Sequence, residues 1–550
     1  MLQLETVTLS SLEKVFLEKE LSVSSTLQKG SMFQNEIYSF QVAYKLSPEN
    51  TWGRTHVKVD VESEIKDYIQ VKSVGLVPSE LPCYPIIDDN YMRTEPGLFP
   101  DPLYDLWERS LFITSQYWRS LWITVKPSQK VLPGTYPIKI IFKKEEEILS
   151  SVIFEITILA GKLPKQKLIH TEWFHADCIA DYYKVEVFSE KHWDLIEKFI
   201  KIAVEHGINM ILTPVFTPPL DTAVGGERTT VQLVEVTREG NHYTFDFTKL
   251  KRWVEMCLHC GIEYFEIAHL FTQWGAKHAP KIMGYEQGQY KKLFGWGTDA
   301  AGEEYQTFLQ QFLTQLVRFI EEHDLKERCY FHISDEPRQE HLENYKKALE
   351  GIADILKDYP IIDALSDYDF YQHQLVKMPI PANSSIEPFL ENQVPNLWTY
   401  YCCGQYAEVS NRFFSMPSAR NRIIGTQLYK YNIVGFLHWG YNFWNAQYSA
   451  FRINPFQVTD SDRAFPSGDP FLVYPGEEGP IPSIRLLVLN EALQDLRAME
   501  YLEILKGKEF VIRLIEEELQ EPLTFKKYPK DAHYLLNLRE KINHAIVENQ

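Results

Sequence analysis

Two adjacent carboxylates, Asp335 and Glu336, follow an apolar, strand-like run in the segment "YFHISDEPRQEH". Neighbouring carboxylates make each other's ionisation less favourable, so a purely structural design tends to avoid such a pair. The structural alternative is a helix N-terminus, where an acid satisfies free amides and contributes about 0.3–1 kcal/mol. That alternative accounts for one acid better than for two. We therefore interpret Asp335 and Glu336 as candidate catalytic residues.

An alternating series of strand-like and helix-like segments carries this pair. With "LIHTEWF" as the first strand, "CYFHIS" is the fourth and "IVGFLHW" the eighth, and the candidates between them are "IIDALS", "SSIEPF" and "NLWTYYC". Because each crossover helix returns the chain to the same end of the sheet, the series predicts parallel pairing and a (β/α)8 TIM-like barrel. The chemistry of such barrels lies at the carboxyl ends of the strands, which is where the pair stands.

Length and pattern predict a multidomain protein with β and α/β parts. The chain has 550 residues, more than one hydrophobic core usually holds. Residues 1–160 contain alternating apolar strands such as "THVKVDVES", which predict an N-terminal antiparallel β-sandwich. Residues 165–450 are assigned to the catalytic barrel. Residues 451–550 are assigned to a loop-rich excursion and a C-terminal helical segment.

Composition argues against several kinds of partner. Lys and Arg number 56 against 75 Asp and Glu, a formal charge of −19, which argues against nucleic acid or an anionic membrane. No run of about 18 apolar residues predicts a membrane span. The first residues lack the features of a secretory signal and the seven cysteines are scattered, so we expect a cytoplasmic location. Without an HxH strand or an HExxH helix, we expect no metal and no cofactor.

The adjacency of the two acids bears on the hydrolytic chemistry that they can perform. Successive side chains of a strand point to opposite sides, so consecutive acids are poorly placed to flank a glycosidic bond as a two-carboxylate glycosidase requires. They suit a scheme in which one acid protonates the leaving oxygen and its neighbour orients a nucleophile of the substrate, such as the carbonyl of a 2-acetamido sugar. Two alternatives remain: a two-carboxylate glycosidase that uses Glu336 and Glu387, and a non-hydrolytic glycan-binding barrel.

The pair and several further segments resemble glycoside hydrolase family 123. With "HISDEP", the matching segments are "TPVFTPPLDT", "FEIAHLFTQWGAKHAPKI", "LWTYYC", "GFLHWGYNFW" and "DPFLVYPG", spread over residues 165–500. The resemblance implies a retaining, exo-acting β-N-acetylgalactosaminidase that cleaves small glycans or glycosides with a terminal 2-acetamido sugar by substrate-assisted catalysis. It also implies that Glu336 is the general acid and then the general base, and that Asp335 accepts the acetamido N–H.

Further residues are candidates for contact with the sugar. Tyr400 matches the family segment and could donate to the acetamido carbonyl, although a barrel-filling aromatic is the structural alternative. Trp439 and Trp444 could form the floor on which a pyranose ring stacks, but aromatic residues make up 14% of the chain and most belong to a core. The remaining candidates lie in loops after the first and third strands, with loop bracing as the alternative: His175, Asp177, Trp274 and His278.

Overall fold

The N-terminal region is a sandwich of two five-stranded sheets. The computed structural model describes residues 4–21, 26–46, 54–114, 117–273, 275–337 and 339–550. The sheets have the strand orders β1-β3-β8-β5-β6 and β2-β10-β9-β4-β7, antiparallel except for the pair of β2 and β10. The strands are β1 (Leu4–Ser10), β2 (Lys29–Phe33), β3 (Tyr38–Leu46), β4 (Arg54–Glu62), β5 (Ile69–Ser79), β6 (Gly97–Asp105), β7 (Ser110–Thr114), β8 (Arg119–Val125), β9 (Gly134–Lys144) and β10 (Glu147–Leu159).

Alternation of side chains explains why these segments form a sandwich. In β4 the valines at 57 and 59 are buried while the alternating residues His56 and Lys58 are exposed, which is the period of two that a half-buried strand requires. The inward residues of both sheets form one apolar cluster that includes Phe40, Phe142 and Phe154. The predicted N-terminal sandwich is therefore present.

Eight parallel strands form the central barrel. They follow one another in chain order around the sheet, and β22 pairs with both β11 and β21. A parallel bridge between Ala382 and Tyr400 joins the remaining edge, so the ring is nearly closed. The strands are β11 (Ile169–Glu172), β12 (Met210–Thr213), β15 (Tyr264–Ile267), β18 (Cys329–His332), β19 (Ile361–Ala364), β20 (Met378–Ile380), β21 (Trp398–Tyr400) and β22 (Gly435–His438).

Helices connect the barrel strands and cover them. The longest are amphipathic: α2 begins where the Ser189 side chain accepts from the amide of His192, and it buries Trp193, Ile196 and Phe199 on one face. The helices are α1 (Ala176–Tyr183), α2 (Glu190–Glu205), α3 (Thr248–Cys260), α4 (Glu303–Glu322), α5 (Leu342–Glu350), α6 (Ala353–Leu356), α7 (Asp369–Gln372), α8 (Glu387–Glu391), α9 (Ser418–Arg422) and α10 (Ile424–Lys430).

Two parts of the barrel differ from the sequence-based prediction. The sixth strand is Met378–Ile380, whereas the predicted segment "SSIEPF" is a turn leading into α8, with Pro388 in the first helical turn. A four-stranded sheet, which the sequence did not predict, is inserted in the connections after β12 and β15. Its strands are β13 (Glu235–Glu239), β14 (His242–Asp246), β16 (Ile282–Glu286) and β17 (Gln289–Phe294).

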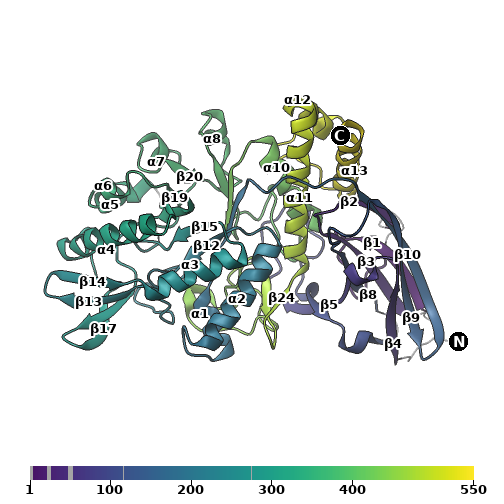
Figure 1. The fold of residues 1–550 in the computed structure, drawn as a ribbon, viewed down its shortest axis with the longest axis horizontal. Coiled ribbons are helices and arrows are strands. Elements are labelled where there is room, and N and C mark those ends of the chain that lie inside the picture. Colours follow the sequence, from purple (N-terminus) through teal and green to yellow (C-terminus); the bar gives the residue numbers. More distant parts are fainter. Residues whose placement is uncertain (1–3, 22–25, 47–53, 115–116, 274, 338) are drawn as a thin grey trace.

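C-terminal helices lie between the barrel and the sandwich (Figure 1). They are α11 (Ile484–Lys506), α12 (Lys508–Glu516) and α13 (Ala532–Asn549), preceded by the hairpin of β23 (Val473–Pro475) and β24 (Pro480–Pro482). Helix α11 is buried along most of its length, and its Arg485 forms an ion pair with Asp101 of β6 at 2.8 Å. Among the described residues, none of the helices has the length and apolarity to cross a membrane.

Candidate active site

A small cavity of about 140 Å³ opens at the carboxyl ends of the barrel strands. Asp335 and Glu336 face it from the segment after β18, Tyr400 from the end of β21, and Trp439 from the residue that follows β22. Among the described residues, the lining consists of Trp173, Leu220, Asp221, Gln273, Asp335, Glu336, Ala364, Tyr400, Cys402, Cys403, Leu437, Trp439 and Phe465. The cavity therefore lies where barrel enzymes carry their chemistry.

A backbone turn lets two consecutive acids face the same cavity. Strand β18 ends at His332, so Asp335 and Glu336 lie beyond the regular alternation of a strand. Glu336 has φ of +45°, the left-handed region, which costs a non-glycine residue about 1–3 kcal/mol. Its amide donates to the carbonyl of Ala364 at 3.0 Å, which holds this conformation.

The buried imidazole of His332 lies next to Asp335 and Glu336 and is held by two other carboxylates. His332 is fully buried and lies between Glu266 of β15 at 2.8 Å and Asp363 of β19 at 3.5 Å. Burial alone would lower the pKa of His332, but hydrogen bonds to Asp363 and Glu266 outweigh it and raise the pKa to about 10. The two carboxylates therefore favour the protonated form of His332 next to the catalytic candidates.

The two acids differ in their electrostatic environment. Burial and the neighbouring Glu336 raise the pKa of Asp335 well above its ordinary value, while the His332 cation acts in the opposite direction. Asp335 therefore keeps its proton to a higher pH than an ordinary aspartic acid does. A retained proton is what general acid catalysis requires.

Tyr400 and Trp439 complete the polar and the aromatic side of the cavity. The Tyr400 hydroxyl donates to Oε1 of Glu336 at 2.9 Å, and the Trp439 indole N–H donates to Asp469 at 2.9 Å. Trp439 also packs against Phe465, with ring centroids 5.2 Å apart. Tyr401 points the other way, toward Asn421, as strand alternation requires.

The catalytic-domain model of glycoside hydrolase family 123 matches residues 173–502. This stretch runs from the end of β11 through most of α11 and covers more than half of the chain. The chain belongs to glycoside hydrolase family 123. It is thus a glycoside hydrolase whose substrates are glycans, and the family resemblance seen in the sequence is confirmed. A comparison with curated proteins gives no match.

A solved structure of a family 123 enzyme supports the fold of this chain. A family 123 glycoside hydrolase from Clostridium perfringens, studied for glycolipid glycan hydrolysis, matches with 16% identity and a TM-score of 0.73 over 99% of this chain and 97% of that one. Its likeness confirms the predicted order of sandwich, barrel and helices. Two family 5 enzymes match far more loosely: a Bacteroides ovatus xyloglucanase (8% identity, TM-score 0.32, 86% and 99% covered) and a Rhizomucor miehei mannosidase (11%, 0.31, 62% and 95%).

Some predicted sugar-binding residues of this enzyme lie away from the cavity. Trp444 is 2% exposed; its ring packs on Phe199 and Tyr182, and its N–H donates to Val473. Its ring is therefore a core element with no face open for stacking. Sequence could not separate it from Trp439, because both tryptophans lie after β22 in irregular backbone, where no period fixes the direction of a side chain.

Two of the four candidates that were expected in loops, His175 and Asp177, act as braces. His175 and Asp177 are buried on Arg228, which bonds both oxygens of Asp177 at 2.7 Å. The other ring nitrogen of His175 lies 2.9 Å from the carbonyl of Trp439, so this network positions the Trp439 segment. His278 lines a separate surface cavity with Asp299, and Trp274 lies outside the described residues.

Glu387, the alternative nucleophile, is not at the end of a barrel strand. It begins helix α8, its side chain is 41% exposed, and it pairs with Lys526 at 3.2 Å. It does not line the cavity in the described part of the chain. The error follows from the incorrect sixth strand, because "SSIEPF" has an apolar pattern but contains a proline that favours a helix start.

Several site residues were missed by the sequence analysis. Asp221 and Gln273 line the cavity, and burial raises the pKa of Asp221 to about 6. Both stand in segments that carried the family resemblance, "TPPLDT" and "FTQWGAKH". Glu266 and Asp363, the partners of His332, were also missed. The available signal was an acid inside a short apolar strand, in "YFEI" and "IIDA".

The family 123 site offers no obvious metal position. No group of three or more His, Cys, Asp or Glu side chains suited to a metal ion occurs among the residues that the structure describes. The seven cysteines are free thiols, and Cys402 and Cys403 line the cavity. Carboxyl, hydroxyl, amide, indole and thiol groups line the cavity.

The raised pKa of His332 predicts a loss of stability in alkali. A group with a raised folded-state pKa contributes fully below its unfolded value, about 6.5, and loses that contribution as pH rises through about 10. We expect the free energy of unfolding to fall between these values by an amount on the order of a few kcal/mol. Urea denaturation across this range should show the fall in the wild type and a flatter profile in His332→Gln. His259→Gln, on the exposed side of α3, should keep the wild-type slope.

Proposed function

We propose that this enzyme removes terminal β-linked N-acetylgalactosamine with retention of configuration, using the acetamido group of the substrate as nucleophile. The observation that carries the proposal is that two consecutive carboxyl groups, Asp335 and Glu336, face one cavity. Its volume of about 140 Å³ is below the roughly 300–1,000 Å³ of drug-sized sites, which favours one terminal sugar over a polymer segment. The family resemblance of the sequence supports the choice of sugar.

The first step would form an oxazoline-type intermediate. The acetamido carbonyl oxygen attacks the anomeric carbon while the bond to the leaving oxygen breaks, and Glu336 gives that oxygen its proton. Tyr400 donates to Oε1 of Glu336, which fixes the carboxyl group in the cavity. Water then attacks the anomeric carbon, Glu336 takes up its proton, and the carbon–oxygen bond to the acetamido group breaks. Two inversions give net retention.

Asp335 would control the acetamido group. In the free enzyme the pair retains a proton, because burial and the neighbouring carboxylate oppose ionisation of Asp335. An acetamido N–H that donates to Asp335 favours its ionised form, so the proton moves to Glu336, next to the leaving oxygen. Substrate binding would thereby set the protonation state that the first step needs.

Glycolipid glycans are the substrate class that we favour. The Clostridium perfringens enzyme with the same fold was studied for hydrolysis of glycolipid glycans. A cavity that accommodates a single terminal sugar does not require the rest of such a glycan to enter the protein. We further propose a cytoplasmic location, which the seven unpaired thiols favour.

The test compares nitrophenyl β-N-acetylgalactosaminide with nitrophenyl β-galactoside, which lacks the acetamido group. We expect turnover of the first only, and inhibition by the thiazoline analogue of N-acetylgalactosamine. Equal turnover of both substrates, or trapping of a fluorosugar on Asp221 or another carboxylate, would replace the proposal with a two-carboxylate mechanism. Binding of glycans without any cleavage would favour the non-hydrolytic alternative.

Trp439 and Trp444 offer a matched pair of variants. Trp439→Ala removes aromatic surface from the cavity wall, so we expect the KM of the nitrophenyl substrate to rise roughly tenfold with a smaller change in kcat. Trp444→Phe should leave KM unchanged and lower the free energy of unfolding by about 1–3 kcal/mol, because it truncates a core ring. Steady-state kinetics and urea denaturation of both variants check the prediction; an unchanged KM in Trp439→Ala would contradict it.

A further inference from the structure

A second, larger cavity lies between the sandwich and the C-terminal helices. Its volume is about 580 Å³, and its walls come from β2 and β3 on one side and from α11 and α13 on the other. It shares no lining residue with the active-site cavity. It is within the size range of small-molecule sites, about 300–1,000 Å³.

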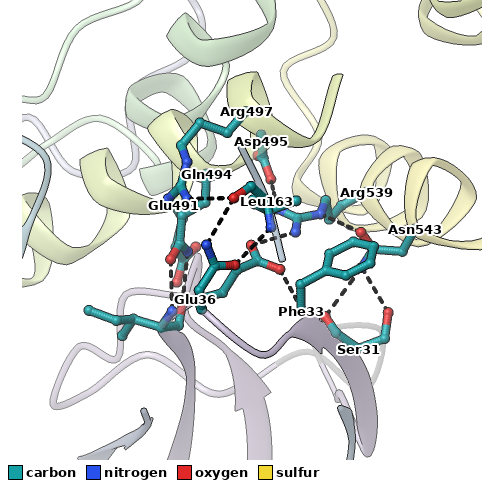
Figure 2. Close-up of polar contacts among 12 residues, drawn as sticks. Ser31, Phe33, Glu36, Leu163, Glu491, Gln494, Asp495, Arg497, Arg539 and Asn543 are labelled. Carbon is teal, nitrogen blue, oxygen red and sulfur yellow. Dashed lines mark hydrogen bonds and ion pairs between the residues drawn. The ribbon is translucent and has the colours of Figure 1, made fainter. Parts of the chain in front are cut away.

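A network of paired charges forms one side of this cavity. Arg422 and Arg539 both bond Asp495, and Arg539 also reaches Glu36 in the turn between β2 and β3. Figure 2 shows side chains of α11 and α13 converging on that turn and on Ser31 of β2. Because these ion pairs are buried and the pair of Arg422 and Asp495 is bidentate, they hold the polar side of the cavity in one geometry.

Glu491 is the member of this network with unused bonding capacity. It is 6% exposed, and its Oε2 accepts from Ser11 at 2.8 Å and from Arg422 at 2.9 Å. Its Oε1 is buried without a hydrogen-bond partner among the described residues. Burial, opposed by Arg422, raises the pKa of Glu491 to about 7. A buried acceptor without a partner is costly in a protein, and a ligand donor would satisfy it.

The remaining walls offer apolar and aromatic surface. Tyr38 enters the cavity beside Gly30, where a Cβ would lie only 2.0 Å from its hydroxyl. Apolar side chains also line the wall: Leu27, Met32, Leu159, Leu536 and Val547. The charged lining residues are balanced, with Lys29, Arg422 and Arg539 against Glu36, Glu491 and Glu540. This balance disfavours a strongly cationic or anionic ligand.

We propose that this interface cavity is a second, non-catalytic binding site for a neutral saccharide of one or two sugar units. A hydroxyl group both donates and accepts, so it pairs with Oε1 of Glu491 in either protonation state. The apolar face of a sugar ring fits the wall of Tyr38 and leucines, while its other hydroxyls meet the fixed serine, asparagine and arginine groups. The site is independent of the proposed hydrolysis, because it lies in a different cavity.

Amide hydrogen exchange of the full chain tests the proposal, with galactose, N-acetylgalactosamine and lactose as separate probes. At about ten times the dissociation constant, we expect exchange in Lys29–Phe33 and Ala532–Asn549 to slow by roughly tenfold for at least one probe. Val547→Trp, which fills the mouth from a 44% exposed position, and Glu491→Leu, which removes the acceptor, should both remove this protection. Leu132→Trp, at a 72% exposed position that lines neither cavity, is the matched control and should keep it.

Three results would overturn the second site. They are no protection of these two segments by any of the three saccharides, protection that persists in both variants, and protection by spermidine or inorganic phosphate instead. Hydrolysis of nitrophenyl glycosides, measured in the same variants, shows separately whether the proposed hydrolytic function holds when the second site fails its binding test. Val547→Trp should hydrolyse them at the wild-type rate whether or not the second site binds sugar.

Discussion

Glu336→Gln should lower kcat by about 10²- to 10⁴-fold for glycosides with poor leaving groups, the range expected when a general acid is removed. The substitution keeps the size of the side chain and its contact with Tyr400 but removes the proton that the leaving oxygen needs. A dinitrophenyl leaving group departs without protonation, so its release should be slowed far less. The measurement is kcat for a series of leaving groups of increasing pKa, which should give a steeper dependence in the variant.

The control for this variant is Glu340→Gln. Glu340 lies four residues further along the same segment, and its side chain is 73% exposed outside the cavity. We expect wild-type kcat with every leaving group. A uniform loss of activity across the series in Glu336→Gln would show that Glu336 is not the proton donor.

The position of the candidate catalytic pair could be predicted because it depends on local patterns. Strand and helix periods identified the fourth strand, and the carboxyl-end rule for barrels then placed Asp335 and Glu336 at the site. The left-handed conformation of Glu336 has no sequence signal, since glycine or asparagine would be expected there. This conformation, and not strand geometry, brings both acids to one cavity.

Contacts between distant segments could not be predicted. His332 precedes the pair by three residues, but its partners Glu266 and Asp363 stand 66 and 31 residues away from it, and only the closed barrel brings them together. Glu387 was misplaced for a different reason. Its segment resembled a strand, because short apolar runs do not distinguish strand from helix. Periodicity thus specifies elements, whereas the site depends on which strand ends become neighbours.

Asp335→Asn should lower kcat for nitrophenyl β-N-acetylgalactosaminide by about 10²- to 10³-fold, the loss typical when one electrostatic group at a developing charge is removed. The charge develops on the acetamido group as it closes on the anomeric carbon. A neutral amide cannot stabilise it as a carboxylate does. The variant should still bind the thiazoline analogue, but more weakly, because the analogue reproduces the cyclised geometry.

The pH profile separates this role from a structural one. Burial and Glu336 raise the pKa of Asp335, so the proton that Asp335 passes to Glu336 on substrate binding is lost only as pH rises through that raised pKa, which sets the alkaline limb of activity. In Glu336→Gln, assayed with the dinitrophenyl substrate, no proton donor is needed, so the alkaline limb should disappear and the bell shape becomes a plateau. An alkaline limb that stays at the wild-type pH would contradict the sharing of one proton by these two carboxyl groups, and with it the division of labour that we assign to them.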